Sequence, residues 1–175
     1  MFLNYIKDFY VKNKLKNSLH DLKSNILSVE IETVGLLIDA SHFSEKEVLI
    51  NELIANGIPK KSIKVIVYRD RFKSNEVNSQ FGFSDKHLNW KGEIENPNVN
   101  DFINEKFDLL ISFYDVEKAI LMLITHNSKA AFKVGFSAID KKLNHLTVDT
   151  NVKNYKVFTA ELFRYLKLFK QNIIQ

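Results

Sequence analysis

Short, mostly apolar runs recur along the chain and predict strands, and the run at 33–40 shows no polar alternation, as expected for a strand covered on both faces. The clearest lie at 33–40, 63–68, 108–113 and 132–136, and 146–149 is a shorter candidate. Continuous apolar runs of this length are typical of parallel strands, because helices cover both faces of a parallel sheet. The pattern therefore predicts a mostly parallel sheet of about five strands.

Apolar residues at spacings of three and four predict an amphipathic helix at each end of the chain. We expect the first over residues 1–25 and the last over residues 152–173. The stripe that the first helix is expected to bury comprises Phe2, Ile6, Phe9, Leu15, Leu19, Leu22 and Ile26.

Capping signals predict the helices that cross between strands. Ser44 and Glu47 form a capping box before an apolar run, and Asn56-Gly-Ile-Pro is a stop signal for the same helix. Asp115 is expected to cap a helix over 116–125. Each helix thus lies between two predicted strands, as in a βαβ unit.

A long polar excursion over 69–100 interrupts this regular order. Excursions of this length are often functional when ordered. Residues 87–92 are a candidate edge strand, and a brief helix over 99–106 is expected with Asn98 as its cap.

The βαβ pattern occurs twice, over 33–68 and 107–135. We therefore predict one α/β domain over 1–175: a three-layer, Rossmann-like fold with a mostly parallel sheet and amphipathic terminal helices. The sheet and its crossover helices are expected to occupy 33–150.

Composition is consistent with a single cytoplasmic domain. A chain of 175 residues with 45% hydrophobic and 26% charged residues has an ordinary globular composition. It has no cysteine, which excludes disulfides, thiolate metal sites and cysteine nucleophiles. No stretch reaches the roughly 20 apolar residues that a membrane-spanning helix requires, and the N-terminus does not resemble a signal peptide.

Polar side chains follow the predicted strands at the point where each strand ends. Because the carboxyl ends of parallel strands share one edge, where such folds usually hold their ligands, we expect these side chains to face one another. Acids, a histidine and two arginines there would bind an anion or perform acid-base chemistry. Ordinary turn and capping roles are the alternative. The candidate ligand-binding residues are Asp39, Ser41, His42, Arg69, Arg71, Tyr114 and Asp115.

Motifs that would define a reaction are missing from the sequence. Neither a phosphate loop nor a G-x-G-x-x-G turn nor a G-x-S-x-G turn is present. The five histidines show no metal-binding spacing. We predict no cofactor, no metal and no catalytic residue.

The charge is distributed unevenly along the chain. Residues 1–24 carry five lysines and two aspartates, and residues from Lys153 onward carry five basic residues and one glutamate. If the terminal helices lie side by side, they would form a basic face for RNA or a ribosome, for an acidic partner or, less favoured, for an anionic membrane. Solvated helix faces are the simpler interpretation. The candidate nucleic-acid contacts are Lys7, Lys12, Lys14 and Lys16.

Two segments carry a resemblance to known families. Phe107-Asp-Leu-Leu-Ile and Ser128-Lys-Ala-Ala-Phe-Lys-Val-Gly-Phe resemble a family of short, uncharacterised bacterial α/β proteins, recognised as a domain of unknown function. This resemblance runs over most of the chain, includes Lys91-Gly-Glu-Ile-Glu-Asn, and implies no activity. More remotely, 108–111 and 128–136 resemble the N-terminal half of heptosyltransferase-like glycosyltransferases. That would imply a degenerate glycosyltransferase-like domain, because those enzymes bind their donor mainly in a second domain.

We therefore predict a non-catalytic interaction or scaffold protein of the bacterial cytoplasm, with a protein partner and an undetermined oligomeric state. The alternatives are a nucleotide or sugar-phosphate site at the carboxyl edge and an RNA- or ribosome-associated protein. An interaction protein predicts an exposed apolar or basic patch. A ligand site predicts a pocket where Asp39, His42, Arg69 and Asp115 converge.

Overall fold

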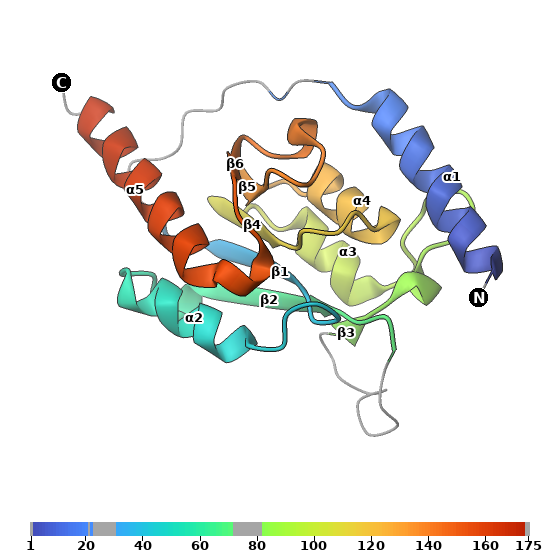
Figure 1. Ribbon diagram of the computed structural model, residues 1–175, viewed down its shortest axis with the longest axis horizontal. Coiled ribbons are helices and arrows are strands. Elements are labelled where there is room, and N and C mark those ends of the chain that lie inside the picture. Colours follow the sequence, from blue (N-terminus) through green and yellow to red (C-terminus); the bar gives the residue numbers. More distant parts are fainter. Residues whose placement is uncertain (1, 21, 23–30, 72–81, 174–175) are drawn as a thin grey trace.

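The computed structural model describes residues 2–20, 22, 31–71 and 82–173. In this part of the chain one sheet of six parallel strands, in the order β3-β2-β1-β4-β5-β6, is flanked by helices (Figure 1). The predicted α/β, Rossmann-like fold is confirmed, with six strands in place of about five. The elements are α1 (Phe2–Ser18), β1 (Val34–Asp39), α2 (Lys46–Ala55), β2 (Ile63–Tyr68), β3 (Gly82–Phe83), α3 (Pro97–Asn104), β4 (Leu109–Phe113), α4 (Ala119–Asn127), β5 (Phe132–Phe136), β6 (Leu146–Val148) and α5 (Tyr155–Ile173).

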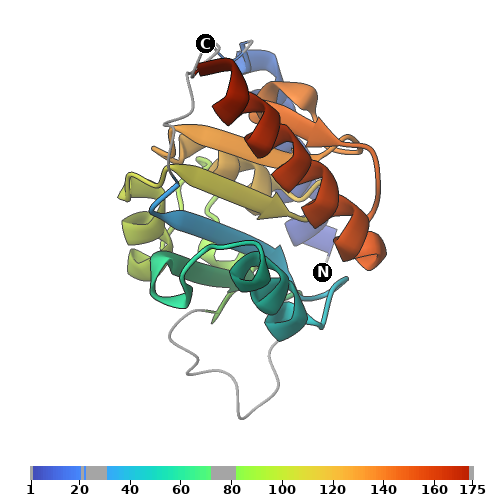
Figure 2. The same ribbon diagram turned by 90° about the vertical axis from the view of Figure 1, so that its left-hand side faces the viewer.

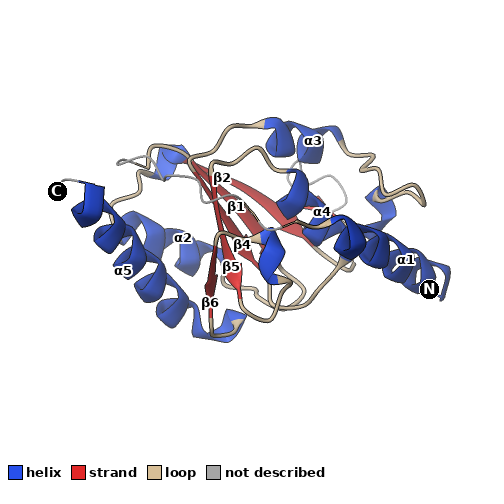
Figure 3. Cartoon of the chain, turned by 90° about the horizontal axis from the view of Figure 1, so that it is seen from above, coloured by secondary structure: helices blue, strands red, loops and turns tan. Residues whose placement is uncertain are grey.

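Two hydrophobic cores lie on opposite faces of the sheet. Helices α2 and α5 cover one face, and α1, α3 and α4 cover the other (Figures 2 and 3). Alternate residues of β1 supply the two cores, with Leu36 and Ile38 in the first and Leu37 in the second. Because α1 and α5 lie on opposite faces, the two basic ends do not combine into one basic face. The hypothesis of one basic face required the two terminal helices to lie side by side, and they do not.

The connections reverse direction across the sheet between β1 and β4. Helix α2 connects β1 to β2 on one side, whereas α4 connects β4 to β5 on the other. In doubly wound folds the carboxyl ends of two such strands border the usual ligand crevice. The connections 40–45 and 114–118 therefore decide what this edge can bind.

The predicted helix ends are partly confirmed. Helix α2 stops as expected: Gly57 adopts φ +98°, and the N–H of Ile58 donates to the carbonyl of Leu53. Helix α1 ends at Ser18, where the hydroxyl donates to the Leu15 carbonyl at 2.8 Å. The predicted helix over 1–25 is therefore too long, although residues 21 and 23–25 lie outside the described residues. No helix among the described residues is both long and apolar enough to span a bilayer.

The predicted helix caps are wrong for both crossover helices. Helix α2 begins at Lys46, and Glu45, at the capping position, makes no capping hydrogen bond with its side chain. Ahead of this helix, Phe43 is buried edge-on against Phe113, with ring centroids 4.8 Å apart. The Ser44 and Glu47 capping box does not form.

Helix α4 begins at Ala119, three residues later than predicted. The carboxylate of Asp8, in α1, accepts the N–H of Ala119 at 2.7 Å. Asp115 instead accepts the N–H of Val152 at 3.0 Å, ahead of α5. A long-range contact from α1 has thus taken the capping role that the sequence assigned to Asp115.

The excursion after β2 is ordered differently from the prediction. The edge strand is β3, and residues 87–92 contribute only an isolated antiparallel bridge between Leu88 and Ile94. Helix α3 begins at Pro97 and is capped by Asn96, whose side chain accepts the N–H of Val99 at 3.2 Å. Proline at the first helical position is typical, so the cap lies two residues before the predicted Asn98. Residues 72–81 lie outside the described residues.

Candidate functional site

Asp39 ends β1 at the carboxyl edge and is almost completely buried, with 1% of its surface exposed. Its Oδ1 accepts the N–H of Ser41 at 2.9 Å. Its Oδ2 lies 2.8 Å from the Nζ of Lys118. This close ion pair is not aligned as a hydrogen bond, since Asp39 Oδ2 has no hydrogen-bond partner among the described residues. The buried carboxylate therefore depends mainly on the Lys118 ammonium for its charge compensation.

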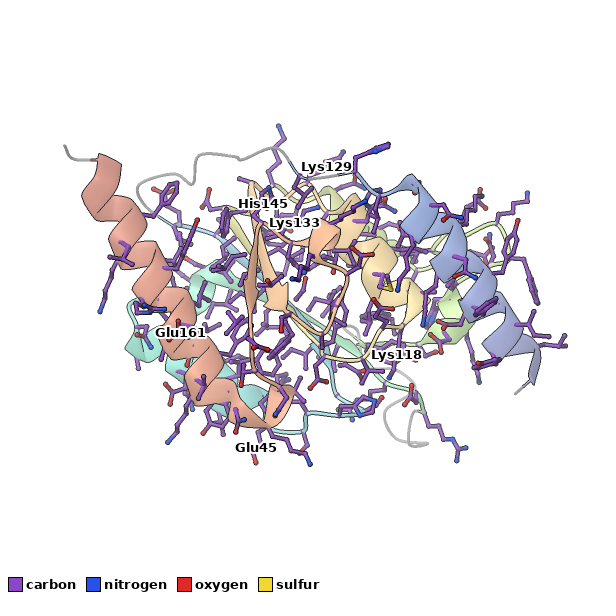
Figure 4. The ribbon with its side chains drawn as sticks, turned by 45° about the horizontal axis from the view of Figure 1, so that its top comes forward. Glu45, Lys118, Lys129, Lys133, His145 and Glu161 are labelled. Carbon is purple, nitrogen blue, oxygen red and sulfur yellow. The ribbon has the colours of Figure 1, made fainter. Side chains whose placement is uncertain are left out.

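Lys118, labelled in Figure 4, immediately precedes α4. Its side chain reaches Asp39, at the end of β1, and Asp70, just after β2. Its Nζ lies 2.9 Å from Asp70 Oδ1 and 4.3 Å from the centroid of the Tyr68 ring. The Tyr68 hydroxyl donates to the same Asp70 oxygen at 2.8 Å. We call Asp39, Tyr68, Asp70 and Lys118 the Lys118 cluster.

The electrostatics of the Lys118 cluster reflect this sharing of one ammonium. Burial alone would raise the pKa of the Asp70 carboxyl, but hydrogen bonds from Lys118 and Tyr68 outweigh burial and lower that pKa. Burial, together with the charge of Asp85, raises the pKa of Tyr68. Tyr68 therefore acts as a neutral hydrogen-bond donor within the cluster.

Three predicted ligand-binding residues meet at this edge. Besides Asp39 itself, Ser41 accepts the N–H of Asp70 on its hydroxyl oxygen at 2.9 Å. The Nε2 of His42 lies 4.0 Å from Asp39 Oδ2, and the His42 side chain is partly exposed. Lys118 was missed, because the helix was predicted to begin at 116 and so placed this lysine inside it. A prediction that put Lys118 in the loop between β4 and α4 would have placed it at the carboxyl edge.

The remaining predicted residues take other positions. Arg69 lines a separate small pocket of about 190 Å³, and Arg71 is exposed. Tyr114 is buried, with its hydroxyl 2.8 Å from the Thr125 Oγ1. Asp115 holds the segment before α5, as described above. Tyr114 and Asp115 thus have their polar groups engaged elsewhere, and the pocket at Arg69 is smaller than the roughly 300–1,000 Å³ of usual ligand sites.

The chemistry open to the Lys118 cluster is limited by its internal compensation. Two carboxylates and one ring share the ammonium, so an anion would have to displace a carboxylate, and Asp39 would then be buried without its counter-charge. Among the described residues, no group of three acids, histidines or cysteines is arranged to hold a metal. The geometry favours a structural ion-pair cluster over a phosphate-binding site.

The lysines predicted to contact nucleic acid are mostly engaged within the chain. Lys7 is buried, and its Nζ donates to the carbonyls of Asp85 at 2.9 Å and Leu88 at 2.7 Å. Lys12 donates to the carbonyl of Glu117 at 3.1 Å, and Lys16 lies 2.6 Å from the Glu117 carboxylate. Lys7 is unavailable to a phosphate, and the other two would have to leave Glu117.

A second candidate site is the side of α1 that faces away from the sheet. Val11, Leu15 and Leu19 are buried, as predicted for the last two, but Ile6 and Phe9 are exposed and that part of the prediction is wrong. We define the outer face of α1 as the exposed residues Leu3, Tyr5, Ile6, Phe9 and Tyr10. The signal was present in the sequence, because apolar residues occur around more of this helix than one buried stripe requires.

A protein-family model matches residues 7–169, most of the chain. The chain belongs to DUF6913, a family of unknown function. The predicted membership of an uncharacterised family is confirmed. The DUF6913 region includes the Lys118 cluster and the outer-face residues Phe9 and Tyr10. Comparison with curated proteins and with solved structures gave no match, and the heptosyltransferase resemblance has no support from these findings.

Proposed function

We propose that this chain is a non-catalytic interaction protein that inserts the outer face of α1 into an acid-rimmed apolar groove on a partner protein. The observation that carries this proposal is the exposure of five large apolar side chains on one helix. Their exposed fractions are 67% for Leu3, 71% for Tyr5, 38% for Ile6, 59% for Phe9 and 56% for Tyr10.

The outer face of α1 has the spacing of a helix that binds in a groove. Tyr5 and Phe9 are four residues apart, as are Ile6 and Tyr10, so the side chains form adjacent rows on one side. At about 200 Å² for an aromatic side chain and somewhat less for Leu3 and Ile6, the five expose roughly 500 Å². Patches of this size on monomers are often functional.

The opposite side of α1 is held firmly in place. Lys7 binds the 85–88 turn, Asp8 caps α4, and Lys12 and Lys16 contact Glu117. A partner would therefore meet a helix whose orientation is already fixed, which reduces the entropy lost on binding.

The charge of α1 indicates what the partner is. The charged residues of α1 are four lysines and one aspartate, and the carboxylate of that aspartate, Asp8, is engaged with Ala119. Among these lysines Lys14 is exposed and has no described ion pair, and an acidic group on the rim of the groove would complement it. A second copy of the chain would present the same positive charge, and like charges that face one another disfavour that contact.

A membrane is a poorer match than a protein groove. Juxtamembrane lysines contribute about 1 kcal/mol each near anionic lipids. Lys7, Lys12 and Lys16 are already engaged within the chain, which leaves Lys14 as the exposed lysine of α1 without a described ion pair. Tyrosine and phenylalanine are, in contrast, typical anchors at protein interfaces. Because the chain lacks cysteine, a partner in the reducing cytoplasm is compatible with it.

The test compares affinity purifications from native lysate, with and without nuclease, using the natural chain and two variants. Tyr5→Ser with Phe9→Ser removes the centre of the outer face. Val157→Ser with Leu168→Ser is the matched control, since these α5 residues are about half exposed on the other side of the molecule. A protein captured by the natural chain and the control, but not by the outer-face variant, is then purified and titrated directly.

We expect the outer-face variant to weaken the direct affinity at least tenfold, and added salt to weaken binding of the natural chain. Equal binding by the two variants would refute the proposal. Three other outcomes would also refute a protein groove as the partner. Selective retention on anionic vesicles would indicate a membrane, and capture that depends on nuclease-sensitive RNA would indicate RNA. A dimer that the outer-face variant abolishes would indicate a second copy of the chain.

A further inference from the structure

A pocket of about 650 Å³ lies at the amino edge of the sheet, far from the Lys118 cluster in the fold. Three segments border it: residues 31–33 before β1, the connection between α2 and β2, and the last half of α5. Its volume lies in the range of about 300–1,000 Å³ that is usual for small-molecule sites.

The inner wall of this pocket is apolar. Ile58, Phe163 and Leu166 line it and belong to the core between α2, α5 and the sheet, with exposed fractions below 9%. Ile31, partly buried against the same core, extends the apolar surface toward the rim. An alkyl chain lying on this wall would be removed from water without leaving a polar group of its own unpaired.

The rim of the pocket carries an excess of positive charge. Lys61 and Lys167 are exposed there, and neither forms an ion pair in the part of the chain that the structure describes, in contrast to Lys118. Glu32 is the acid on the rim, so the charged lining side chains sum to +1. The carboxyl end of α2, at Asn56, also borders the pocket, and its partial negative charge reduces the positive potential at the rim, so a head group of low charge is favoured.

From this combination we infer that the pocket binds a long-chain carboxylate. The acyl chain lies on Ile58, Phe163 and Leu166, and the carboxylate lies between Lys61 and Lys167. A singly charged head group matches the net rim charge of +1, whereas a phosphate dianion would not. This site is separate from the outer face of α1, so it neither requires nor supports the proposed protein partner.

The test uses the full chain and the fluorescent probe 11-(dansylamino)undecanoate below its micelle concentration. Displacement by octanoate, decanoate and dodecanoate should tighten with chain length, by up to about fourfold per added methylene. Dodecanol, which has the chain without the charge, should compete much more weakly than dodecanoate.

Three variants locate the binding. Lys61→Gln with Lys167→Gln should weaken dodecanoate binding by about tenfold and leave dodecanol unchanged. Lys60→Gln, an exposed neighbour that does not line the pocket, should leave both unchanged. Ser62→Phe, which adds a ring at the rim, should weaken both ligands.

Absence of saturable probe binding would overturn the inference. So would equal competition by dodecanol and dodecanoate, or unchanged dodecanoate affinity in the lysine variant. If Ser62→Phe does not fold, as judged by circular dichroism, the exposed lysine variant still decides the outcome.

Discussion

Replacing Lys118 with methionine is expected to destabilise the fold by about 3–5 kcal/mol, the usual cost of removing one partner from a buried ion pair. Methionine keeps most of the unbranched stem, so the loss reports mainly on the ammonium. Asp39, 1% exposed, would lose its closest counter-charge. Asp70 would lose the same partner, but its side chain is 53% exposed and water would replace the contact.

The free energy of unfolding is measured by urea denaturation at pH 7, and thermal unfolding should shift downward by about 10 °C for a domain of this size. Lys64→Met is the matched control, because Lys64 pairs with Glu105 on the surface, where both side chains are about 40% exposed. That change should cost less than about 1 kcal/mol.

A double variant separates charge from packing. Lys118→Met with Asp39→Asn removes both charges and keeps an Oδ1 acceptor for the N–H of Ser41. It should recover more than half of the stability lost in Lys118→Met, because the unpaired buried carboxylate is gone. If Lys118→Met costs no more than Lys64→Met, or if the double variant recovers nothing, the role given to this ion pair is refuted.

Two further changes test contacts that lie outside the Lys118 cluster. Burial lowers the pKa of Lys133 to about 8 from its usual 10.5, so the folded chain binds fewer protons than the unfolded chain between these pH values, and stability should rise with pH across that window. Between pH 7.5 and 10.5 the free energy of unfolding of the natural chain, measured by urea denaturation, should rise by up to about 3 kcal/mol relative to that of Lys133→Met. Parallel plots of this free energy against pH for the two proteins would contradict the prediction. Asp8→Ala should lower the free energy of unfolding by about 1 kcal/mol, because the cap on the N–H of Ala119 is lost. Asp8→Asn should keep most of this stability, because its amide oxygen can still accept that N–H. Equal losses in the two variants would assign the effect to something other than the cap.

The sheet could be predicted because parallel strands carry their own signal. The runs at 34–39, 63–68, 109–113 and 132–136 are mostly apolar and each holds a single polar side chain, a pattern typical of strands covered on both faces. β3 could not be found in this way, since two paired residues are too few to form a pattern.

The face of α1 that packs against the sheet could not be read from spacing alone. A helical stripe could include either Val11 and Leu15, four residues apart, or Ile6 and Phe9, three residues apart. The choice between them is made by polar contacts to distant segments, above all Lys7 to the carbonyls of Asp85 and Leu88. Tertiary partners of this kind are invisible to a local pattern.

Only part of the Lys118 cluster at the carboxyl edge could be predicted, because the rest depends on a contact between distant segments. Asp39, Ser41 and His42 follow a strand directly, so topology alone placed them together. Lys118 lies four residues beyond the first residue after β4, and its place in the cluster depends on where α4 begins. That start is set by Asp8 from a helix more than a hundred residues earlier.

The contact between Asp8 and Ala119 spans 111 residues of sequence, and this separation has a consequence for synthesis. At about 5–20 residues per second, a ribosome needs on the order of ten seconds to produce the segment that completes the docking site of α1. During this interval both apolar sides of α1 are exposed on the nascent chain. The helix that is made first is thus left without its docking site while more than a hundred further residues are made, and a chaperone that binds short aromatic segments has an opportunity there.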